Sequence, residues 1–145
     1  MRWRTGIGVG VLLAVLGTSE ARAQGCSRAD FEAVVDQASA TLRDLVQRNT
    51  AEFQGKLRAL KTKRGWTQDQ FMSEGARFVR DDKIVEYDER SESLLARINQ
   101  GSDGGGTTPD CGMLGDLKAT MATLIEVQEA KWRHMSSTID AELAK

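Results

Sequence analysis

The chain has 145 residues, a net charge of −1 and a single proline. A nearly neutral chain gives no electrostatic footprint for nucleic acid or for an anionic membrane, so no nucleic-acid partner is expected. Scarce proline, few aromatic residues and abundant Ala, Leu, Glu, Arg and Gln favour helix, and the length fits one hydrophobic core.

The first 23 residues have the three parts of a secretory signal peptide. Arg2 and Arg4 give a positive start, an apolar run covers residues 7–16, and Ala21 to Ala23 form a small-x-small cleavage site. The sequence therefore predicts a cleavable signal over 1–23, cut before Gln24, and one helical domain over 24–145. The apolar run is shorter than the ~20 residues that span a bilayer. We expect a periplasmic or secreted bacterial protein with no integral membrane segment after signal removal.

Two cysteines, Cys26 and Cys111, follow the signal and stand at the starts of two helical patterns. Exported proteins meet an oxidising environment, so a disulfide between these residues is expected. Lipid attachment at Cys26 is the minor alternative, because the stretch from Ala23 to Cys26 resembles the lipoprotein attachment box. Gln24 departs from that pattern, and lipidation would leave Cys111 as an odd thiol.

The first helix is predicted over 27–64. Ser27 is a suitable N-cap, and basic residues crowd the far end, where cations complement the helix dipole. We favour this helix-end role for the basic residues over an anion-binding patch. The apolar stripe alternates steps of four and three and then slips slightly. Its members are Phe31, Val35, Ala38, Leu42, Leu45, Asn49, Phe53, Leu57 and Leu60.

The turn that follows combines three local devices. Gly65 can adopt the left-handed conformation that ends a helix. Thr67 and Gln70 have the spacing of a capping box, and Trp66 and Phe71 have that of a hydrophobic staple. The three devices together predict a tight hairpin, with the second helix folding back along the first.

The second helix is predicted over 67–100 and has a less regular pattern. One apolar stripe passes through Phe71 and Phe78 and another begins at Ile84, but the step between Phe78 and Ile84 fits neither spacing. A kink, a stammer or a break between Arg80 and Lys83 would each explain this. The acidic residues that follow are interpreted as a solvated face rather than a metal site.

Residues 101–108 form a glycine-rich linker without the Lys-Ser/Thr ending of a phosphate-binding loop. Thr108 and Pro109 predict the start of a third helix over 109–144. Three helices of similar length joined by one tight turn predict an all-α fold, an antiparallel up-down-up three-helix bundle with long coiled-coil-like helices. That topology brings the starts of the first and third helices together, and with them the two cysteines.

Asn49 and Gln128 fall where the repeats favour an apolar residue, near the middle of their helices. An interhelical amide hydrogen bond between them would set the register of the bundle. The alternative is that one of the side chains turns to solvent at the slip in the first helix.

No catalytic, cofactor-binding or metal-ligating constellation is visible, and no cofactor is expected. His134 is the only histidine, and its own helical face offers no carboxylate, thiol or second imidazole. A metal site at His134 would need ligands from other helices. The chain has no CxxC and no CxxCH, so thiol exchange and haem attachment lack their motifs.

We expect a non-enzymatic exported protein that binds another envelope or secreted protein, as adaptor, assembly subunit or chaperone-like binder, or that self-associates. The alternative is a periplasmic carrier of a small ligand or metal, with a pocket between helices. A hydrolase or lyase that depends on acidic residues is the third class. A binder predicts an exposed apolar strip, a carrier a cavity with convergent polar groups, and an enzyme a carboxylate of raised pKa.

Overall fold

The computed structural model describes residues 26–103 and 110–145, and all regular secondary structure within them is helical. The predicted all-α class is therefore confirmed. The predicted signal over 1–23 lies outside the described residues, as do Thr108 and Pro109. The elements are α1 (Arg28–Arg64), α2 (Gln68–Gly75), the 3-10 turn η1 (Ala76–Phe78), α3 (Asp82–Asp103) and α4 (Cys111–Leu143).

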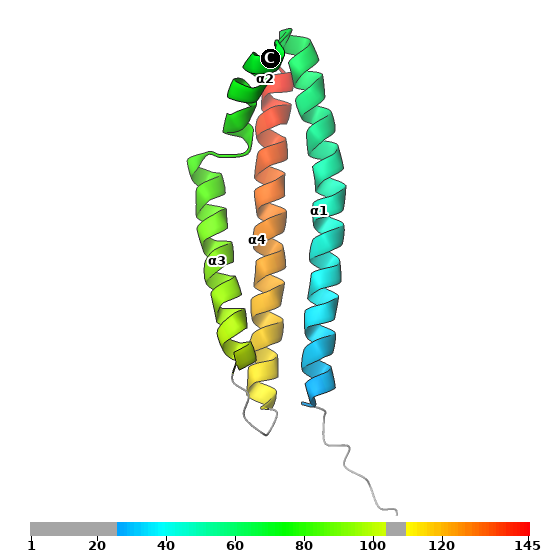
Figure 1. Cartoon of the computed structure of the whole chain (residues 1–145), viewed down its shortest axis with the longest axis vertical. Helices are drawn as coiled ribbons and strands as arrows, with labels where there is room; N and C mark the ends of the chain where they lie inside the picture. The colour runs from blue at the N-terminus through cyan, green and yellow to red at the C-terminus, as the bar shows by residue number, and fades with distance from the viewer. Residues whose placement is uncertain (1–25, 104–109) are drawn as a thin grey trace, which may run out of the picture.

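The long helix α4 lies between α1 and α3 in Figure 1 and packs along both of them. The chain rises through α1, returns through α2, η1 and α3, and rises again through α4 (Figure 1). The returning segment thus packs mainly on α4, whereas the sequence led us to expect it along the first helix. Leu94 and Ile98 of α3 are buried in a cluster to which α4 contributes Met121, Leu124 and Val127 and α1 contributes Ala38.

Helix α1 is defined at both ends by the residues that the sequence singles out. Ser27 and Asp30 form a reciprocal capping box. Gly65 has φ 62°, and its N–H donates to Thr62 O at 3.2 Å while Trp66 N–H donates to Lys61 O at 3.1 Å. This pair of bonds is a Schellman motif, which needs the left-handed backbone that glycine adopts without strain.

The second predicted helix is broken in two, which settles the irregularity between Arg80 and Lys83. Helix α2 ends at Gly75, η1 follows, and α3 begins at Asp82. The physical reason is burial: Phe78 and Ile84 are only 3% and 1% exposed, and six residues of continuous helix would point them in different directions. Because the helix is interrupted, the side chains of Phe78 and Ile84 can both point into the core.

The linker and α4 differ in their bounds from the prediction. Helix α3 continues to Asp103, into the segment predicted as linker. Helix α4 begins at Cys111 with Asp110 as its N-cap, whose Oδ1 accepts the Gly112 N–H at 2.7 Å. Aspartate is as good an N-cap as threonine, so local sequence alone does not choose between Asp110 and the expected Thr108.

The core consists of two apolar clusters rather than one continuous seam. The cluster nearer the start of α1 contains Ala38, Leu94, Ile98, Met121, Leu124 and Val127. The cluster nearer the end of α1 contains Phe53, Leu60, Phe78, Ile84, Met135 and Ile139. Along α4 the two clusters are separated by a stretch that includes the polar residues Gln128 and Lys131.

Candidate functional site

Cys26 and Cys111 form a disulfide, with their Cα atoms 5.0 Å apart and a separation of 85 positions in sequence. The predicted pairing is confirmed. The bond joins Cys26, two residues before the start of α1, to the first residue of α4, so it holds together two parallel helices that are distant in sequence. A covalent link of this kind restricts the unfolded chain more than the folded one.

The turn residues have the contacts that capping predicts. Thr67 N–H donates to Gln70 Oε1 at 2.9 Å, and Gln70 N–H donates to Thr67 Oγ1 at 3.3 Å. Trp66 packs against the apolar cluster that contains Leu60, and Phe71 lies under Lys61 Nζ, 5.1 Å from the ring centroid. A direct staple contact between Trp66 and Phe71 stays a prediction.

Asn49 and Gln128 have different partners instead of each other. Asn49 Nδ2 donates to Leu45 O within α1 at 2.7 Å. Gln128 Nε2 donates to Ser91 Oγ of α3 at 2.8 Å, and Ser91 is itself only 6% exposed. An interhelical contact therefore exists at Gln128, but it joins α4 to α3.

Gln128 belongs to a polar ladder that sequence reasoning missed. Along α4, Lys131 Nζ lies 2.5 Å from Asp88 Oδ1, and His134 Nε2 lies 2.7 Å from Asp81 Oδ2. From one contact to the next, the residue number increases on α4 and decreases on the partner segment, which is the order expected for antiparallel helices. The available signal was the three-residue spacing of Gln128, Lys131 and His134, which places them on one side of α4.

Asp81 makes two contacts at the break between η1 and α3. Its Oδ1 accepts Ile84 N–H at 2.7 Å, which satisfies a free donor at the start of α3. Partial burial is the largest single influence and raises the pKa of Asp81, but the hydrogen bonds from His134 and from Ile84 N–H together lower this pKa below its usual value. The carboxylate is thus held in its charged form.

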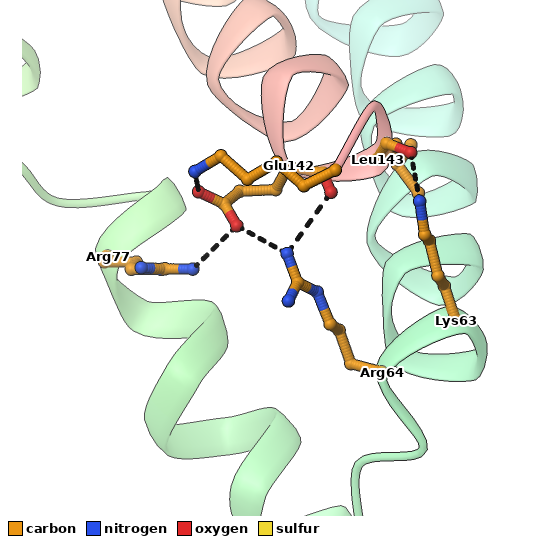
Figure 2. Close-up of polar contacts among 6 residues, drawn as sticks. Lys63, Arg64, Arg77, Glu142 and Leu143 are labelled. Atoms are coloured by element: carbon orange, nitrogen blue, oxygen red, sulfur yellow. Dashed lines mark hydrogen bonds and ion pairs between the residues drawn. The ribbon is translucent and has the colours of Figure 1, made fainter.

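The ends of α1 and α4 are joined by a cluster of charged residues (Figure 2). The Glu142 carboxylate forms ion pairs with Arg64 at 2.8 Å, with Lys145 at 2.6 Å and with the more distant Arg77 of η1 at 3.6 Å. Lys63 Nζ donates to the carbonyl oxygen of Leu143. The hydrogen bond from Lys145, followed by the charges of the two arginines, lowers the pKa of Glu142 despite partial desolvation. Basic residues at the end of α1 therefore complement the C-terminal end of the neighbouring helix α4.

An exposed apolar strip lies on the outer side of the returning segment. Met72 of α2 is 66% exposed and Val79, after η1, is 47% exposed. Ala76 stands between them and is also exposed, so the three follow one another at steps of four and three. Phe78, on the inward side, is buried. We call Met72, Ala76 and Val79 the α2 strip.

The described residues contain no group of three His, Cys, Asp or Glu side chains that could hold a metal ion. Among them, the carboxylates with a resolved pKa shift are Asp30, Asp81 and Glu142, and each pKa is lowered, opposite to what a general acid requires. Within the same part of the chain, no helix combines the length and apolar character needed to cross a membrane.

Comparison with known proteins finds no matching family model, no similar characterised protein and no similar solved structure.

Proposed function

We propose that this protein is exported, that residues 1–23 are removed, and that the mature chain forms an antiparallel up-down-up bundle. The observation that supports export is the disulfide between Cys26 and Cys111, since such bonds persist in oxidising compartments. The denatured mass of protein recovered from an exporting bacterium tests this. Cleavage before Gln24 and a deficit of two hydrogens are expected, whereas an intact N-terminus or an acylated Cys26 would contradict the proposal.

The mature protein, in this proposal, is a non-enzymatic binder of another envelope or secreted protein. The α2 strip carries the proposal, because the large apolar side chain of Met72 belongs to a residue that is 66% exposed. Methionine is enriched at protein interfaces and adapts to irregular partner surfaces. The strip is small, so it fits a transient or peptide-sized contact rather than an obligate assembly.

Met72→Asp tests this use of the strip, with Val46→Asp as the matched control. Val46 is also apolar and 45% exposed, but it lies on α1, away from the α2 strip. Both variants should melt like the wild type, because neither side chain is buried. Met72→Asp should shift the protein from a larger complex to the free form on size-exclusion of envelope extracts, while Val46→Asp should not. An equal distribution of all three proteins contradicts the proposal.

A small-ligand carrier is the second candidate function, and one observation favours it. The side of α1 and α4 not used by α3 has an open groove of about 590 Å³ with convergent polar side chains. This volume lies within the range of small-molecule sites. The groove and the α2 strip share no residue, so the two functions are tested independently.

A further inference from the structure

The groove between α1 and α4 has a lining that restricts its ligand. Residues of α4 that form hydrogen bonds with α3, such as Gln128 and Lys131, alternate with residues that line the groove, such as Glu129 and Arg133. The two sets therefore occupy different sides of the same helix. No residue of α2, η1 or α3 lines the groove.

An indole forms part of the lining. Trp132 is partly buried, and its ring meets that of Phe53 nearly edge to face, with centroids 6.1 Å apart and planes at 72°. Phe53 is only 6% exposed, so the indole of Trp132 packs against a buried aromatic ring. Such an indole offers a preformed apolar surface at low entropic cost.

The polar groups around Trp132 retain unused hydrogen-bonding capacity. Among the described residues, the side chains of Glu129, Arg133 and Ser136 in the lining form no hydrogen bond or ion pair. Asn49 uses its amide N–H on Leu45 O, which leaves the side-chain oxygen as an acceptor. The groove thus combines a carboxylate, a guanidinium, a hydroxyl and an amide with one aromatic surface.

The lining of the groove contains both positively and negatively charged side chains, and they are also paired with each other at one end of the groove. Lys56 Nζ lies 3.0 Å from Glu52 and 2.7 Å from Asp140, which bridges α1 to α4. A strongly charged ligand of either sign would meet groups that repel it, and a purely apolar ligand would bury polar groups without partners. The lining suits a neutral ligand that has one apolar face and many hydroxyl or amide groups around its edge.

We propose that this groove binds a carbohydrate, with one pyranose ring stacked on Trp132 and its hydroxyl or acetamido groups bonded to Glu129, Arg133 and Asn49. A sugar ring has an apolar face of C–H groups and an edge that both donates and accepts, which matches this lining. The proposal rests on the carrier function and does not involve the α2 strip. N-acetylglucosamine units with this neutral chemistry are present both in chitin-like polysaccharides and in peptidoglycan strands, where N-acetylmuramic acid adds a lactyl carboxylate.

Titration of the disulfide-bonded mature protein with two soluble tetrasaccharides tests the proposal by NMR. One probe is chitotetraose and the other is the disaccharide dimer of N-acetylglucosamine and N-acetylmuramic acid. The readout is the indole Nε1–H of Trp132, assigned by comparison with Trp66→Phe. A saturable shift is expected with at least one probe, and the tighter probe identifies the source of the glycan.

Arg133→Ala and Arg43→Ala provide a matched pair, because both arginines are exposed on helices but only Arg133 lines the groove. Arg133→Ala should weaken saccharide binding about tenfold, the effect of one charge-assisted hydrogen bond, and Arg43→Ala should leave it unchanged. The proposal is overturned if neither probe shifts Trp132 at about 10 mM, where even weak binding is visible. It is also overturned if Arg133→Ala binds as well as wild type. A retained non-saccharide molecule in a native mass spectrum would overturn the carbohydrate assignment while supporting a carrier.

Discussion

Asp81 and His134 connect the break in the returning segment to the C-terminal half of α4. The Oδ2 atom of Asp81 lies 2.7 Å from His134 Nε2, while its Oδ1 accepts the Ile84 N–H at the start of α3. One carboxylate therefore fixes both where α3 begins and how it sits against α4. The break is a defined structural feature, since Asp81 within it has one partner at the start of α3 and another on α4.

Replacement of Asp81 should show this double role. Asp81→Ala removes the acceptor for Ile84 N–H and the partner of His134, and should cost about 1–2 kcal/mol of stability, in the range of N-cap losses. Asp81→Asn keeps a capping oxygen and should cost about 0.5 kcal/mol or less. Urea unfolding measures both values. An Asp81→Ala variant as stable as wild type would show that the cap is not formed.

Acid should destabilise the protein partly through the same residue. The pKa of Asp81 is lowered in the folded state from its ordinary 3.8, so the unfolded chain takes up this proton first as the pH falls. Its contribution is present above pH 3.8 and is lost as the pH falls through the lower folded value. Asp30 and Glu142 shift in the same direction. Thermal melts should show a smaller acid loss for Asp81→Asn than for wild type, and equal losses would exclude Asp81 as a source.

Much of the fold follows from local signals in the sequence, and the tertiary polar contacts do not. The capping residues Ser27, Thr67 and Gly65 act on neighbouring backbone, so their spacing predicts the ends of α1 and the start of α2. The disulfide was predictable because a predicted export signal and the two expected helix starts constrain it. The pair Asp81 and His134 was not, since the two residues are 53 apart and the break that brings Asp81 to α4 depends on burial of Phe78.

The disulfide should contribute substantially to stability. Closing a loop across 85 residues contributes about 4 kcal/mol in the chain-entropy model. Cys111→Ser, or reduction of the wild type, should therefore lower the melting temperature clearly, which calorimetry measures. Reduction of Cys111→Ser is the control and should change nothing further. A melt that is insensitive to reduction would show that the link does not constrain the unfolded chain.

Gly55 inside α1 and Gly65 at its C-terminal cap should respond to alanine in opposite directions. Gly65 has φ 62°, so Gly65→Ala introduces strain of about 1 kcal/mol. Gly55 lies inside the helix with no atom within 4 Å of an added Cβ, so Gly55→Ala should stabilise by about 0.5–1 kcal/mol. Chemical unfolding compares the pair. Stabilisation by both substitutions would mean that α1 does not end in the left-handed conformation.

Site-specific photo-crosslinking in the exporting bacterium tests the proposed protein-binding role most directly. A photoreactive residue at Met72, in the α2 strip, is compared with one at Arg43, exposed on α1. The proposal predicts a discrete adduct of higher mass from position 72 and none from position 43, with the adduct reduced by Val79→Asp. Absence of an adduct at position 72, or the same adduct from both positions, would contradict partner binding through the α2 strip.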